Sequence, residues 1–79
     1  MGKTERHYTI VLDPNPEDGI YTVTVPALPG CLTQGKTVEE CVERAKEAIT
    51  GWIASAEAHG EPIPVETIRP LVIGVDVAA

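Results

Sequence analysis

Cysteine and histidine are the residue types in this chain best suited to nucleophilic or metal chemistry. Cys31 and Cys41 could act as nucleophiles, or could bind zinc together with His7 and His59. Zinc sites usually place their ligands in closely spaced pairs, and this sequence has neither a Cys-x-x-Cys pair nor paired histidines. Cys31 also has no base evident beside it, so both cysteines are interpreted as packed thiols and no metal or other cofactor is predicted.

Carboxylates at strand positions could form a nuclease site. A metal-dependent nuclease needs several carboxylates that converge on its metal ions. Asp13 ends one expected strand and Asp76 lies late in another, but no carboxylate of the expected helix faces inward to join them. We therefore predict no catalytic residue and interpret these acids as solvated or partner-facing. Magnesium-dependent cleavage of RNA or DNA ranks behind the two binding functions given below.

The charge balance bears on possible partners. The 79 residues contain 6 Lys and Arg against 12 Asp and Glu, which gives a formal net charge of −6. Binding to nucleic acid draws on clustered basic residues, which are absent here, so a basic protein is the favoured partner and no direct DNA binding is expected. The N-terminus has no apolar run of the signal-peptide kind, and no stretch approaches the roughly 20 apolar residues of a membrane span. We expect a soluble, cytoplasmic protein of one domain over residues 1–79, with no membrane partner.

Alternating apolar residues predict three strands in the first half of the chain. Residues 7–13 and 20–25 alternate with period two and are separated by a Pro-rich and Asp-Gly turn, which predicts a β-hairpin. Pro14 is expected to end the first of these strands. A stiff corner at residues 26–30 then leads to a short strand at residues 31–36.

A helix and a fourth strand are predicted in the second half. Thr37 and Glu40 have the spacing of a capping box, in which each side chain caps the other's amide. The helix that follows carries an apolar arc and ends near Gly60. The arc comprises Val38, Cys41, Val42, Ala45, Ala48, Ile49, Trp52, Ile53 and Ala56.

Residues 71–77 alternate again, with Leu71, Ile73, Val75 and Val77 on one face. They are predicted to form a strand parallel to the first one, beside it. The expected fold is therefore α+β, a β-β-β-α-β two-layer sandwich with one helix on a four-stranded sheet.

Three segments resemble the HicB family of antitoxins. Residues 21–31 read YTVTVPALPGC, residues 33–41 read TQGKTVEEC, and residues 60–64 read GEPIP. They are similar to the family's "dGgYtvtvPdLPGC", "T-x-G-x-T-x-E-E-A" and "G-x-P-I-P" patterns. Ala27 and Lys36 stand where the family often has acids, and Cys41 stands where alanine is usual.

The resemblance implies a partial ribonuclease H-like fold and a homo-oligomer, either a dimer or a tetramer. It also implies a role in neutralising HicA, a small, basic, mRNA-cleaving toxin. Family members commonly carry a DNA-binding segment after the fourth strand. This sequence ends at Ala79, so no C-terminal DNA-binding segment is expected. An orphan oligomeric module of the same fold, which binds another protein or a ligand, is the alternative function.

Two groups of residues are the candidate site. Partner-binding residues are predicted at the hairpin tip and the Pro-Gly corner, namely Asp13, Glu17, Asp18, Pro29, Gly30 and Cys31. Glu17 and Asp18 could equally be simple turn residues. An oligomer interface is predicted on the second face of the sheet, at Val11, Thr22, Thr24, Val72 and Gly74. Toxin docking on that face, or pairing along residues 71–77, stays open.

Overall fold

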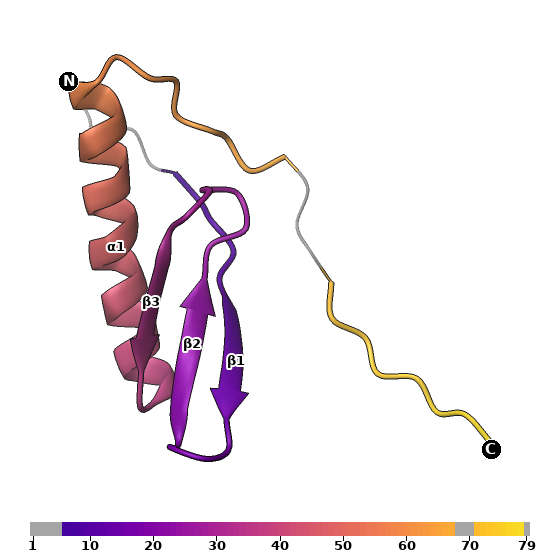
Figure 1. Ribbon diagram of the computed structural model, residues 1–79. Coiled ribbons are helices and arrows are strands. Elements are labelled where there is room, and N and C mark those ends of the chain that lie inside the picture. The colour runs from indigo at the N-terminus through magenta and orange to yellow at the C-terminus, as the bar shows by residue number, and fades with distance from the viewer. Residues whose placement is uncertain (1–5, 68–70, 79) are drawn as a thin grey trace.

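A three-stranded antiparallel sheet and one long helix make up the body of the protein. The computed structural model describes residues 6–67 and 71–78. The strands β1 (Val11–Asn15), β2 (Ile20–Thr24) and β3 (Leu32–Gly35) lie in the order β1-β2-β3, and the helix is α1 (Val38–Ala58). Figure 1 shows α1 running alongside β3. The predicted α+β class and the order of these elements are confirmed.

β1 and β2 form the predicted hairpin, but β1 is shifted along the chain. It begins at Val11 instead of residue 7 and continues through Pro14 to Asn15, so the prediction that Pro14 ends this strand was wrong. Pro14 lies opposite Tyr21 in the ladder. Proline lacks an amide hydrogen and is tolerated in a strand at the edge of a sheet, which is where β1 lies. Gly19, with φ +71°, supplies the positive φ that the turn requires.

A buried corner joins β2 to β3. The Leu28 amide donates to the Val25 carbonyl over 2.9 Å, and the Cys31 amide donates to the Leu28 carbonyl over 3.1 Å. Gly30 takes a φ of +77°. The Leu28 side chain is almost fully buried, so the corner is part of the core and does not hang from it as a loose loop.

Helix α1 begins and ends close to the predicted positions. The Thr37 hydroxyl accepts from the Glu40 amide over 3.0 Å. The Glu40 carboxylate accepts from the Lys36 amide over 2.7 Å, one residue before the partner that a capping box predicts. At the other end Gly60 has a φ of +68°, and the Glu61 amide donates to the Ala56 carbonyl over 2.8 Å. These are the bonds of a Schellman motif, which ends the helix.

The backbone of α1 lies closest to β3, while its buried side chains reach Val23 of β2. Cys41 and Ala45 bury against Val23, and Trp52 packs on a second cluster formed by Val25, Leu28 and Cys31. A Cβ atom at Gly35 would lie 2.9 Å from the Cys41 sulfur and 3.0 Å from the Cys41 amide nitrogen, so the glycine permits this close approach.

Part of the predicted apolar arc does not bury. Val38 and Val42 are exposed. The sheet therefore does not cover the part of the arc that carries these two side chains.

The chain after the helix returns to the start of β1. The Tyr8 hydroxyl donates to the Pro64 carbonyl, and the Thr9 hydroxyl donates to the Glu66 carboxylate over 2.8 Å. The Thr9 amide donates to the same carboxylate, and the His7 ring lies 3.9 Å from it. The Glu66 side chain is only 3% exposed, so these contacts hold residues 64–66 against residues 7–9.

Residues 71–77, called the C-terminal segment below, do not form the predicted fourth strand. The segment is extended but pairs with no other strand among the described residues, and Figure 1 shows it leading away from the sheet. Its five large apolar side chains are 74% to 90% exposed. Within the described residues the sheet therefore has three strands, and residues 71–77 do not add the predicted fourth. Alternation makes a segment suited to pairing but does not supply the edge with which it pairs.

Candidate functional site

The sheet face that points away from α1 carries an apolar row across all the strands. Val11 pairs with Thr24, and Thr24 pairs with Leu32, so these side chains lie side by side. A polar row follows, in which Asp13 pairs with Thr22 and Thr22 with Gln34. The outer face, as we call these rows, therefore unites three of the residues predicted for an oligomer interface, Val11, Thr22 and Thr24.

Leu32 was missed in the sequence, although it is 63% exposed at the end of the apolar row. Its neighbour Cys31 packs inward, and side chains alternate along a strand, so Leu32 must point outward. This alternation is the signal that could have identified it.

Val72 and Gly74, the remaining predicted interface residues, do not lie on the outer face. Both belong to the C-terminal segment, which is outside the sheet. Their grouping with Val11, Thr22 and Thr24 depended on a fourth strand, which residues 71–78 do not form where the structure describes them.

The hairpin tip presents acids from a well-fixed turn. Asp18 accepts from the Ile20 amide over 3.1 Å and from the Asn15 side-chain amide over 3.3 Å. The Glu17 amide donates to the Asn15 side-chain oxygen over 3.0 Å. These bonds show that Asp18 shapes the turn. Asp13, Glu17 and Asp18 are all exposed, so the three residues are accessible to solvent near one end of the sheet.

The Pro-Gly corner lies at the other end of the sheet. β2 connects the two, with the hairpin turn before it and the corner after it (Figure 1). Asp13, Glu17 and Asp18 therefore do not form one surface with Pro29, Gly30 and Cys31. The Trp52 indole donates to the Pro29 carbonyl over 3.0 Å and fixes the corner against α1.

Cys31 is buried within that corner. Its side chain packs with Val25 and Leu28, and the residue is 5% exposed. Burial raises the pKa of the Cys31 thiol above its ordinary value of 9.0. The predicted packing of both cysteines is confirmed, since Cys41 is fully buried as well. The buried Cys31 thiol exposes no surface that a partner could contact directly.

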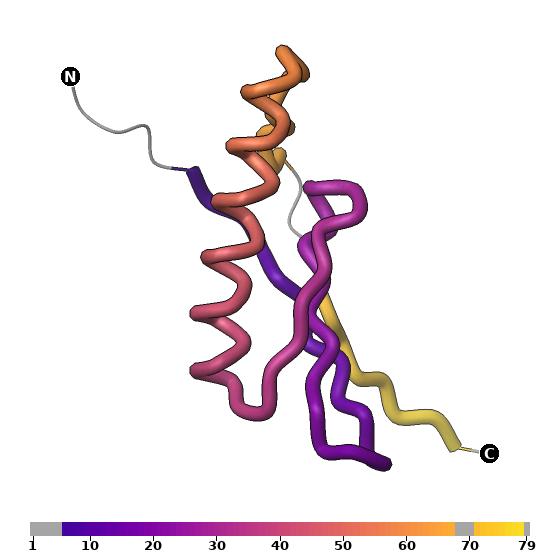
Figure 2. Tube along the Cα trace, turned by 60° about the vertical axis from the view of Figure 1, so that its left-hand side comes forward, coloured from indigo at the N-terminus to yellow at the C-terminus, as the bar shows by residue number. Residues whose placement is uncertain are grey.

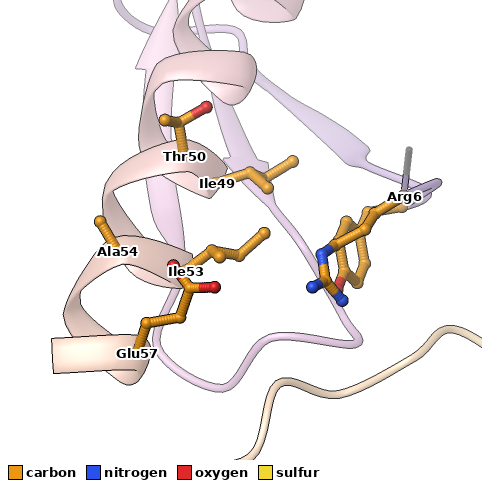
Figure 3. Close-up of a pocket in the computed structure, with 7 residues that line it drawn as sticks. Arg6, Ile49, Thr50, Ile53, Ala54 and Glu57 are labelled. Carbon is orange, nitrogen blue, oxygen red and sulfur yellow. The ribbon is translucent and has the colours of Figure 1, made fainter. Parts of the chain in front are cut away.

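A groove that the sequence did not reveal lies between α1 and the segment that leads into β1. Figure 3 shows Ile49 and Ile53 of the helix facing Arg6 across it. Tyr8 also lines the groove, and Glu57 stands at its rim. The volume is about 580 Å³. An apolar floor between a basic and an acidic rim suits side chains of another polypeptide segment.

Residues 6–67 and 71–78 contain neither a cluster of metal ligands nor a helix suited to spanning a membrane. No group of three or more His, Cys, Asp or Glu side chains in these ranges is arranged to hold a metal ion. Asp13 lies in β1 and Asp76 in the C-terminal segment, so the two candidate nuclease carboxylates do not share the sheet. In the described part of the chain, no helix combines the length and hydrophobicity that crossing a bilayer requires.

The chain is similar in sequence to UPF0150 proteins and to antitoxin HicB. A UPF0150 protein of Thermoplasma acidophilum is 46% identical over 66 residues, which cover 84% of this chain and 94% of that protein. A UPF0150 protein of Archaeoglobus fulgidus is 55% identical over 64 residues, covering 78% and 91% respectively. Antitoxin HicB of Escherichia coli is 48% identical over 42 residues, which are 53% of this chain but only 30% of that antitoxin.

The family model described as the HicB-like antitoxin of bacterial toxin-antitoxin systems matches residues 8–72. That range runs from the segment leading into β1, through the hairpin, the corner and α1, to the start of the C-terminal segment. The chain therefore belongs to the HicB-like antitoxin family.

Proposed function

We propose that this protein is an antitoxin that binds and neutralises a small, basic, mRNA-cleaving toxin of the HicA type, and that it has no catalytic activity of its own. The observation that carries the proposal is the family match over residues 8–72. The net charge of −6 supports it, because an acidic protein attracts a basic one and repels nucleic acid.

The hairpin end of the sheet is the contact surface that we assign to the toxin. Asp13, Glu17 and Asp18 are exposed there, and the bonds of Asn15 and Asp18 fix the turn before any partner arrives. A preformed turn loses little conformational entropy on binding. The outer face adjoins these acids and offers the Val11, Thr24 and Leu32 row as apolar contact area.

The remaining properties are proposed with this function. The protein acts in the cytoplasm as a homo-oligomer, and it does not bind DNA directly, since its 6 basic residues form no stripe along the sequence.

The experiment is to mix the protein with the small basic protein encoded beside its gene. Complex formation and relief of RNA cleavage are expected. Absence of both would contradict the proposal.

A charge-reversal pair locates the surface. Asp13→Lys with Glu17→Lys should weaken the complex by about tenfold or more, because acids near the contact act on both association and affinity. Glu47→Lys with Glu61→Lys makes the same change in net charge at exposed positions elsewhere and is the matched control. An equal loss for both pairs would show a general charge effect and contradict the assignment of the hairpin end.

A second candidate is an orphan oligomeric module without a toxin. It is favoured by the near-complete coverage of UPF0150 relatives, whose names mention no toxin, against 30% coverage of antitoxin HicB. A gene for a small basic protein directly beside this one distinguishes the two, since only the antitoxin requires it.

A further inference from the structure

The C-terminal segment concentrates exposed apolar surface. Leu71, Val72, Ile73, Val75 and Val77 are each at least 74% exposed, and Asp76 is the one charged residue among positions 71–77. The segment runs as an extended chain (Figure 1), and in a strand its alternation would place Leu71, Ile73, Val75 and Val77 on one face. Such a segment is suited to joining a sheet, because pairing would satisfy its backbone groups and bury one of its faces.

β1 offers a sheet edge with which part of the C-terminal segment could pair. Within the described residues, β1 pairs with β2 on one side and with no strand on the other. Pro14 lacks an amide hydrogen, so pairing along this edge is limited to the residues before it, chiefly Ile10 to Asp13. Ile10 and Leu12 face the helix layer and are only partly buried, which leaves room for apolar neighbours at this edge.

The groove lies in the same helix layer. It is bounded by Ile49 and Ile53 of α1 and by Tyr8, which precedes β1 (Figure 3). A strand added beside β1 would direct alternate side chains into the layer between the sheet and the helix. The alternation of Leu71, Ile73, Val75 and Val77 fits that requirement.

We propose that two copies of the chain exchange their C-terminal segments, so that residues 71–77 of each copy pair with the free edge of β1 in the other. The position that the sequence predicts for a fourth strand within one chain is thereby filled by the second copy. The exchange is mutual, so it closes as a symmetric dimer and leaves neither β1 edge open.

The course of the chain favours a second copy over the chain's own edge. Tyr8 and Thr9 hold Pro64 and Glu66 beside the start of β1, so the edge of the same chain is close to where the segment begins. The segment nevertheless leads away from that sheet in Figure 1 and continues beyond the strands in Figure 2. Its large apolar side chains are exposed. Strand exchange buries the same contacts without requiring the segment to turn back.

This inference rests on the homo-oligomer part of the proposed function and is independent of the toxin. The first test measures the mass of the full chain by sedimentation equilibrium. We expect a species of twice the 8.4 kDa chain mass. A mass of 8.4 kDa up to millimolar concentration would overturn both the exchange and the homo-oligomer.

A pair of double variants then identifies the face involved. Ile73→Asp with Val75→Asp should weaken dimerisation by about a hundredfold or more, since charges would enter an apolar layer. Val72→Asp with Gly74→Asp adds the same charge to the opposite face of the same segment and should change it by less than about fivefold. If the second pair disrupts the dimer and the first does not, the exchange is wrong although the homo-oligomer stands.

A mixed sample shows whether residues 71–77 pair with β1 of the same copy or with β1 of the other copy. Isotope-labelled and unlabelled protein are combined, and contacts between differently labelled copies are selected by filtered NMR. Exchange predicts contacts from Ile73 and Val75 to Ile10 and Leu12 of the other copy. If these contacts arise within one copy only, the strand belongs to its own sheet and the proposal fails.

Discussion

β2 and the C-terminal segment are both short runs of alternating apolar and β-branched residues, and both are extended. In β2, Val23 is completely buried between two neighbouring strands and the Cys41 turn of α1. In the C-terminal segment, Ile73 is 74% exposed and has no strand beside it among the described residues. The difference lies in what surrounds each run and not in its pattern. Alternation defines the two faces of a strand, whereas stability comes from the neighbours that cover one of them.

The sharpest test of this comparison makes the same substitution in the buried corner that follows β2 and in the C-terminal segment. Leu28 is 1% exposed and Leu71 is 82% exposed. Leu28→Ala should lower the free energy of unfolding by about 3 kcal/mol, because it removes packed atoms and leaves a cavity. Leu71→Ala should change it by less than about 0.5 kcal/mol in dilute solution. Urea unfolding followed by circular dichroism measures both.

Protein concentration extends that test. If copies exchange strands, the cost of Leu71→Ala should grow as the concentration rises, since Leu71 is then buried in the dimer. A large cost at every concentration would mean that the segment packs within its own chain, and the contrast between the two regions would disappear.

The next largest effect is expected at two glycines. A methyl group at Gly35 would meet the Cys41 sulfur at 2.9 Å and the Cys41 backbone nitrogen at 3.0 Å, whereas nothing lies within 4 Å of one at Gly74. Gly35→Ala should destabilise the fold by about 2 kcal/mol, because backbone atoms of α1 must move. Gly74→Ala should be nearly neutral. Thermal unfolding at one fixed concentration reports the difference, and equal shifts in Tm would contradict it.

The smallest expected effect is the pH dependence due to Cys31. Burial raises the pKa of this thiol in the folded protein above its ordinary value of 9.0, so the unfolded chain loses the proton at a lower pH. The contribution of the thiol to stability is therefore complete below pH 9.0 and declines as the pH rises through the folded pKa.

A series of Tm measurements from pH 8 to 10.5 should show this decline, and Cys31→Ala should flatten it. A steeper decline in the variant would contradict the assignment to Cys31.

Thiol reactivity compares the same two regions. In the variant Val75→Cys, the new thiol should react with iodoacetamide far faster than Cys31 in the folded protein, because Val75 is 84% exposed and Cys31 is 5% exposed.

Much of the body could be predicted because its signals are local. Thr37 and Gly60 bound the helix through bonds that span a few residues, and Gly19 closes a turn in which Asp18 caps a nearby amide. Such contacts depend on residues close in sequence, and a single sequence contains them. The HicB-like motifs cover the same body, which is why the family could also be recognised.

The errors all concern contacts between distant residues. The exposure of Val38 and Val42 depends on where α1 lies across the sheet, and the extension of β1 through Pro14 depends on β1 being an edge. The two groups of predicted partner residues separate because β2 holds them at opposite ends of the sheet. Glu66 was overlooked because its partner Thr9 is 57 positions away in the sequence.

The sequence by itself determined the three strands and the helix of the body, the caps and turns that bound them, the acidity and the family, because each of these is set by residue type and short spacing. The tertiary structure alone decided that Leu32 lies beside Thr24 on the outer face, that a groove opens beside Tyr8, and that the C-terminal segment stands away from the sheet. The physical reason is that a strand's partner is chosen by edges and layers that form only when distant segments meet. Among the described residues of one chain, such an edge and such a segment both lack a strand partner.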